Sequence, residues 1–254
     1  MGLSQANSLS WVPGTPTSGT GHFGSCCNAV DIFHGNTNST LMSAHPCSSA
    51  GQSRCSGAQC GGLNNTSPAA FCDSDGCDFN PRQLNVLFYG KSFSVDTRSK
   101  FTVITQFVTA DNSTGSDLVS ISRTYLQDGF VLTNPRSAIY GIAPQSSDIN
   151  PKFCTQEIRA FSYNNTFDPL GGLKTVGDAL SRGMVLALSI RDDPVSNMAW
   201  LDSTYPPNLP TSTPGVLRGE CPPNPTIPTS PVPSVIFSNI RFGDIGSLGV
   251  GPGL

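Results

Sequence analysis

Two side chains in one short segment are suited to proton transfer. Residues 24–36 read Gly-Ser-Cys-Cys-Asn-Ala-Val-Asp-Ile-Phe-His-Gly-Asn, which places Asp31 shortly before His34. A histidine can donate a proton near neutral pH, and a carboxylate can accept one. In a β-strand Ala29 and Asp31 lie on one face, and His34 joins them only where a bulge shifts the alternation. This segment is the first candidate for a reactive site.

Nine cysteines give the chain a second kind of chemistry. They stand at positions 26, 27, 47, 55, 60, 72, 77, 154 and 221, and Asn-x-Ser/Thr signals for glycosylation occur at Asn38, Asn64, Asn65, Asn112 and Asn164. Both features are typical of the oxidising secretory pathway. The first residues show neither the basic start nor the apolar core of a secretion signal. Because the count is odd, at least one thiol lacks a partner within the chain.

Composition favours a β protein. Only 12% of the residues are charged, whereas soluble domains average roughly 25%. The 254 residues include 26 glycines and 21 prolines, which break helices, so long helices and coiled coils are excluded. The net charge of −3 and the lack of a Lys/Arg cluster argue against a nucleic-acid partner. No apolar run is long enough to span a membrane, so no membrane partner is expected.

The predicted elements are mostly strands, in a single all-β domain over residues 1–254. The first 25 residues and the cysteine-rich stretch 43–82 are predicted as loops. β-Branched and aromatic residues predict strands over 86–89, 92–95, 101–107, 119–126, 130–132, 184–190 and 234–242. The strands 119–126 and 130–132 should form a hairpin. One short amphipathic helix is predicted over 173–181.

The segment 24–36 resembles the catalytic strand of glycoside hydrolase family 7, the fungal cellobiohydrolases and endoglucanases, whose pattern is Gly-Ser-Cys-Cys-x-Glu-Met-Asp-Ile-Trp-Glu-Ala-Asn. Further motifs of that family follow in order over about residues 11 to 247. They include His45-Pro-Cys47, Cys72-Asp-x-Asp-Gly-Cys77-Asp-Phe-Asn-Pro81, Phe88-Tyr-Gly90 and Met198-x-Trp-Leu-Asp-Ser-Thr-Tyr-Pro206. The resemblance implies a concanavalin-like β-sandwich, or jelly roll, with long loops. It also implies a cellulose or other β-1,4-glucan chain as the partner, with no cofactor and no metal.

Carried over residue by residue, the resemblance implies a site without its usual catalytic groups. Retaining glycosidases use two carboxyls about 5–5.5 Å apart, one as nucleophile and one as acid/base. Ala29 stands at the nucleophile position and His34 at the acid/base position, so only the middle carboxylate, Asp31, remains. A methyl group cannot attack an anomeric carbon, and we expect the family's hydrolysis to be lost. The alternative is an active O-glycosyl hydrolase, for example an inverting one with Asp31 as base and His34 as acid.

The resemblance also implies substrate contacts and disulfides. Sugar-binding positions carry over to His45, Asp75, Trp200 and Arg218, while Arg191 replaces a stacking tryptophan. The disulfides carry over as Cys47–Cys72, Cys55–Cys60 and Cys77–Cys154. In the family, the positions of Cys26, Cys27 and Cys221 pair with cysteines that precede this sequence.

Catalytic modules of this family are much longer than the present chain, which begins shortly before the catalytic strand. We therefore expect an incomplete sandwich with no linker and no carbohydrate-binding module. The resemblance implies a truncated relative of a secreted cellulase that no longer hydrolyses glucan and retains at most weak binding. A chain that cannot close its sandwich, and so does nothing by itself, is the other possibility.

Overall fold

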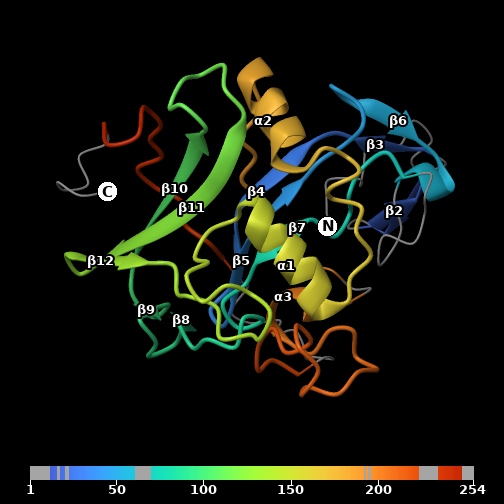
Figure 1. Cartoon of the computed structure of the whole chain (residues 1–254). Coiled ribbons are helices and arrows are strands. Elements are labelled where there is room, and N and C mark those ends of the chain that lie inside the picture. The colour runs from blue at the N-terminus through green and yellow to red at the C-terminus, as the bar shows by residue number, and fades with distance from the viewer. Residues whose placement is uncertain are drawn as a thin grey trace.

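The computed structural model describes residues 12–15, 18–20, 23–60, 70–191, 193, 196–222 and 234–247. Within these residues the chain forms two three-stranded sheets, three two-stranded pairs and three α-helices (Figure 1). None of these helices has the length and apolar character needed to cross a membrane. The predicted all-β class is confirmed, whereas the prediction of a single helix is wrong, because the described residues contain three α-helices.

The first sheet joins β10 (Thr102–Thr109), β11 (Leu118–Gln127) and β12 (Phe130–Thr133). All pairs are antiparallel, and β11 lies in the middle. β11 turns into β12 through Asp128 and Gly129, which both have the positive φ that a two-residue hairpin turn requires. The strands predicted over 101–107, 119–126 and 130–132, and their hairpin, are confirmed.

The second sheet joins β4 (Ala29–Gly35), β5 (Thr40–His45) and β7 (Cys77–Phe79), and it carries the predicted reactive segment. β5 lies in the middle and is buried over its whole length. Its Met42 and Ala44 belong to the main core. Ser43 and His45 point the other way, to the face that Ala29 and Asp31 share, because His45 pairs with Ala29 and Ser43 with Asp31.

Short strand pairs occupy regions that were predicted as loops. β1 (Val12–Thr15) pairs with β2 (Ser18–Thr20), and β3 (Gly24–Cys26) pairs with β6 (Ser53–Cys55). The loop prediction is therefore wrong at these residues, at β7 and at the last three residues of β5. A 3-10 helix, η1 (Gly57–Cys60), follows β6. Buried backbone groups need hydrogen-bond partners even in a cysteine-rich stretch, and short ladders supply them.

The prediction of strands over 86–89 and 92–95 is largely wrong. They shrink to a two-residue parallel bridge between β8 (Tyr89–Gly90) and β9 (Val95–Asp96). The turn that separates them begins at Gly90, whose φ of 142° suits glycine. The apolar residues of this region are buried by ring packing, since Tyr89 lies edge-on to Phe101 with centroids 5.7 Å apart.

Three helices are α1 (Pro151–Phe161), α2 (Gly172–Arg182) and α3 (Ala199–Asp202). α2 confirms the helix predicted over 173–181. α1 is absent from the sequence prediction although it has a regular start. The Asn150 side chain accepts a hydrogen bond from the backbone N–H of Phe153, and proline occupies the first helical position.

The main core lies where α1 and α2 pack on the sheets. α1 contacts β7, and α2 contacts β11 and β5 (Figure 1). Phe79 of β7 meets Phe153 of α1 with ring centroids 5.4 Å apart, and a disulfide from Cys77 to Cys154 joins the same two elements. This core therefore fixes the back of the sheet whose other face carries Ala29 and Asp31.

Two predicted strands, 184–190 and 234–242, are absent. Neither segment has a ladder partner among the described residues, and both are exposed. Val185 is 94% exposed, Ile236 90% and Phe242 96%. A strand exists only where a neighbouring backbone completes its hydrogen bonds, so the apolar pattern alone predicted these two wrongly.

The contact between α2 and β11 can be tested at Gly177. A Cβ there would lie 2.6 Å from the Cβ of Leu118. We expect Gly177→Ala to lower the free energy of unfolding by about 1–3 kcal/mol through overpacking, although alanine favours helix. Urea unfolding measures this. In the control Gly115→Ala, the new Cβ meets nothing within 4 Å, so the midpoint should not fall. A higher midpoint in Gly177→Ala would contradict the close contact.

Candidate functional site

Asp31 and His34 lie on the same side of the second sheet because β4 contains a β-bulge. Asp31 pairs with Ser43, but the next pair is His34 with Leu41, so β4 advances one residue more than β5. The extra residue reverses the alternation of the side chains. His34 Nδ1 therefore lies 3.5 Å from Asp31 Oδ2. The bulge expected from the sequence is confirmed.

A buried arginine from the other sheet holds this bulge. Arg123 lies on β11 and is 3% exposed. Its Nη2 donates to the backbone carbonyl of Ile32, inside the bulge, and its Nη1 donates to the carbonyl of Leu41 at 3.2 Å. A bulge removes backbone groups from the ladder, and a buried carbonyl then needs another donor. Arg123 therefore determines where Asp31 and His34 point.

Asp31 is held between two imidazoles. His45 Nε2 lies 3.3 Å from Asp31 Oδ2, and His45 Nδ1 lies 3.1 Å from the backbone carbonyl of Asp73. Both neighbours of the His45 ring are therefore hydrogen-bond acceptors. Burial alone would raise the pKa of Asp31, but the contacts from His34 and His45 outweigh it and hold that pKa well below its usual range. Asp31 is thus a stable anion and a weak proton acceptor.

Trp200, predicted to stack on a sugar, is largely occupied by protein contacts. It is 7% exposed, and its indole Nε1 donates to Asp193 Oδ2 at 3.1 Å. Its ring lies edge-on to the His34 ring with centroids 5.1 Å apart, and the Arg191 guanidinium lies 6.0 Å over it. Little of the indole surface is left for a ligand.

Arg218, a second predicted sugar contact, also points inward. It is 8% exposed. Its Nη1 donates to Asp78 Oδ2 and to the backbone carbonyl of Trp200, both at 3.1 Å, and its Nη2 donates to the Tyr163 hydroxyl at 2.6 Å. The guanidinium therefore links β7, α3 and the segment after α1.

Glu157 of α1 shares that interior. It is fully buried, and its carboxyl oxygens accept no hydrogen bond from the described residues. Burial and then the negative charge of Asp78 raise the pKa of Glu157 well above its usual value, although Arg218 opposes the shift. Protonation of Glu157 leaves Asp78 as the anion that pairs with Arg218, 3.1 Å away.

His45 and Asp75, the remaining predicted sugar contacts, differ in exposure. His45 is 1% exposed and contacts Asp31, whereas Asp75 is exposed to solvent. Desolvation by the protein around it and then the negative charge of Asp73 raise the pKa of Asp75 to about 6. Solvent screens part of this effect because the side chain is exposed. Asp75 is thus the one of the four that a ligand could reach directly.

A cavity of about 350 Å³ lies apart from these residues. Its lining comes from several loops and contains none of the predicted catalytic or sugar-binding residues. The lining residues are Asn38, Arg82, Gly90, Lys91, Phe93, Glu220, Cys221 and Pro222.

The sequence that forms this site matches the model of a known protein family. The profile of glycosyl hydrolase family 7 matches residues 3–248. The chain belongs to glycosyl hydrolase family 7. The predicted sandwich class is thereby confirmed as well.

Solved structures of this family share the fold. A cellobiohydrolase from Daphnia pulex has 38% identity and a TM-score of 0.79 over 84% of this chain and 49% of its own. A cellobiohydrolase from Melanocarpus albomyces complexed with cellotetraose has 34% identity and a TM-score of 0.74, covering 87% and 50%. A Humicola insolens endocellulase has 34% identity and a TM-score of 0.62, covering 71% and 42%. The chain spans about half the length of these structures.

The family 7 chain forms the three disulfides that the resemblance implied. They are Cys47–Cys72, Cys55–Cys60 and Cys77–Cys154. Cys26, Cys27 and Cys221 are free thiols, and Cys26 is buried among the first two disulfides.

Three residues that shape the site were not predicted from the sequence: Arg123, Glu157 and Asp193. A signal for Arg123 exists, because it lies between Ile121 and Tyr125 on the inward face of a strand, and both of these are fully buried. A charged residue at such a position needs buried partners. No comparable local signal marks Glu157 or Asp193.

The role of Arg123 can be tested with Arg123→Lys. A single ammonium group cannot reach both carbonyls, and each buried carbonyl left without a donor costs about 1–3 kcal/mol. Urea unfolding should therefore show a clear loss of stability. The matched control Arg98→Lys alters an exposed pair with Asp96 and should leave the midpoint unchanged. Equal midpoints for Arg123→Lys and wild type would show that the bulge does not depend on this side chain.

The raised pKa of Glu157 predicts a pH-dependent effect of Glu157→Gln. In the wild type, the contribution of Glu157 to the free energy of unfolding is fully present below the ordinary carboxyl pKa of 4.5. It falls as the pH rises toward the higher pKa that Glu157 has in the folded protein. Glutamine cannot lose a proton, so the variant should gain stability relative to wild type between pH 4 and pH 8. Thermal unfolding across that range measures the difference. A difference that does not change with pH would contradict the shift.

Proposed function

We propose that this family 7 chain does not hydrolyse β-1,4-glucan and contacts such chains only weakly. One observation carries the proposal: on β4 a methyl group, a clamped carboxylate and an imidazole stand at residues 29, 31 and 34. The carry-over from the family pattern supports this interpretation, because the outer two are the positions of the nucleophile and the acid/base.

A retaining double displacement lacks its nucleophile. That reaction needs two carboxyls about 5–5.5 Å apart, one to attack the anomeric carbon and one to protonate the leaving oxygen. Ala29 is 3% exposed and has no atom that can attack. His34 could donate a proton, but protonation without attack is only half of the reaction.

An inverting reaction lacks the necessary space. It needs a base and an acid about 6.5–9.5 Å apart, with a water and the sugar between them. Asp31 Oδ2 and His34 Nδ1 are 3.5 Å apart, and the depressed pKa of Asp31 makes it a weak base. The geometry therefore favours a non-hydrolytic chain over the alternative of an active O-glycosyl hydrolase.

Glucan remains the ligand class that family membership supports. The Melanocarpus albomyces relative is complexed with cellotetraose. In this chain Trp200, Arg218 and His45 are committed to internal contacts, so we propose that Asp75 supplies the main remaining hydroxyl contact. The disulfides and the Asn-x-Ser/Thr signals support a secreted protein.

We expect no release of reducing sugar above the blank from cellulose or an aryl cellobioside, with the Daphnia pulex cellobiohydrolase as the positive control. Turnover by purified protein that Asp31→Ala abolishes would establish the alternative.

Binding can be measured by native electrophoresis in gels that contain hydroxyethyl cellulose. The polysaccharide should slow the migration of the protein only weakly, and Asp75→Ala should reduce this retardation. The control Asp111→Ala removes an exposed acid elsewhere and should leave retardation unchanged.

A further inference from the structure

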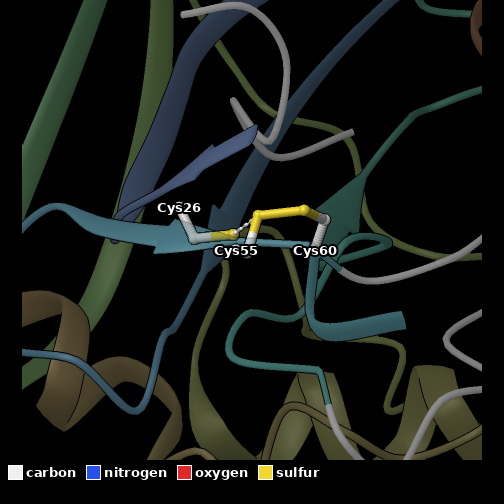
Figure 2. Close-up of side chains that lie close together, drawn as sticks. All are labelled: Cys26, Cys55 and Cys60. Atoms are coloured by element: carbon white, nitrogen blue, oxygen red, sulfur yellow. Dashed lines mark hydrogen bonds between the residues drawn. A yellow bond between two sulfur atoms is a disulfide. The ribbon is translucent and has the colours of Figure 1, made fainter. Parts of the chain in front are cut away.

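Three sulfur atoms gather beside the start of β4. The Sγ atoms of Cys26, Cys55 and Cys60 all lie within 4.8 Å of one another. Cys55 and Cys60 are joined in a disulfide, and the free thiol of Cys26 lies 3.0 Å from Cys55 Sγ. Figure 2 shows the Cys55 sulfur between those of Cys26 and Cys60. The Cys26 thiol therefore contacts Cys55 Sγ, the sulfur of the disulfide that lies nearer to it, and Cys60 Sγ is the sulfur on the other side.

The pairing of β3 with β6 produces this contact. Gly24 lies opposite Cys55 and Cys26 lies opposite Ser53, so the two cysteines are diagonal neighbours on one face. Cys26 and Cys55 are each 1% exposed, and the Cys47–Cys72 disulfide packs in the same cluster. The contact is therefore part of the folded structure rather than of a loose surface loop.

We propose that Cys26 and the Cys55–Cys60 disulfide form a thiol–disulfide exchange site. The Cys26 sulfur attacks Cys55 Sγ, a new Cys26–Cys55 bond forms, and the Cys55–Cys60 bond breaks. Cys60 leaves as the thiolate and takes up the proton that Cys26 has lost. One disulfide and one thiol are present before and after, so the step needs no outside oxidant or reductant. A metal site is less well supported, because two of the three sulfurs are in a disulfide and only one thiol remains as a ligand.

The exchange moves the free thiol outward. Cys26 is buried, whereas Cys60 is partly exposed at the end of η1. Desolvation and then the nearby Cys27 raise the pKa of Cys26, which keeps it as a thiol and makes the attack slow. Once released, Cys60 is the more accessible nucleophile toward small reagents.

The exchange also changes which parts of the chain are tied together. The disulfide in the structure closes a loop between positions 5 residues apart, whereas the exchanged one links β3 to β6 across 29 residues. β3 is followed directly by β4, which carries Ala29, Asp31 and His34. The exchanged form would therefore anchor the strand that enters the candidate site and release η1.

The experiment uses Cys27→Ser/Cys221→Ser, in which Cys26 is the one free thiol that the three disulfides leave. The native variant is treated with N-ethylmaleimide at neutral pH, quenched with acid and digested with pepsin. Pepsin cleaves in acid, where the low thiolate fraction suppresses further exchange, and tandem mass spectrometry of the peptides then assigns the label to Cys26 or to Cys60. We expect the label on Cys60 together with a Cys26–Cys55 bridge, since alkylation of Cys60 draws the exchange forward.

The control adds Cys26→Ser and should take up no label. The proposal is overturned by label on Cys26 with the Cys55–Cys60 bridge intact, by label on Cys60 in the control, or by no label in the test variant. Wild-type protein provides a measurement independent of these variants. When it is denatured at weakly acidic pH with N-ethylmaleimide already present, so that thiols are trapped while exchange is slow, the Cys26–Cys55 isomer should be found beside the Cys55–Cys60 isomer. Its complete absence would count against the exchange.

Discussion

The candidate site depends on one buried guanidinium under one extra residue of strand β4. The bulge between Asp31 and His34 gives up a ladder hydrogen bond, and Arg123 of β11 restores it by donating to the Ile32 carbonyl. Because Arg123 also binds Leu41 of β5, it fixes both partners of the interrupted ladder. The position of the imidazole beside the carboxylate is thus determined by a residue of the opposite sheet.

Charged side chains elsewhere in the interior are also bound by other residues of the protein. Asp31 is satisfied by His34 and His45, and Arg218 is satisfied by Asp78 and Tyr163. Both of these charged groups have their partners inside the protein, as the low polarity around them demands. As a result, three of the four residues predicted to contact sugar, His45, Trp200 and Arg218, direct their hydrogen-bonding groups at other residues of the protein.

Local patterns predicted much of this arrangement. Alternating β-branched residues and an Asp-Gly pair identified the β11–β12 hairpin, and the strand period identified the need for a bulge before His34. The disulfides followed from resemblance to the family. Contacts between distant residues were not accessible in this way: Arg123 meets Ile32 and Glu157 meets Asp78 only because the chain folds. The apolar stretches 184–190 and 234–242 show the converse, since a local pattern without a neighbouring backbone does not make a strand.

These two exposed stretches determine how the molecule behaves in concentrated solution. Side chains such as Val185, Ile236 and Phe242 are apolar and exposed, in segments that have no strand partner among the described residues. Copies that meet there bury apolar area without unfolding. We expect association through these apolar segments, rather than loss of the native packing, to limit the solubility of the protein.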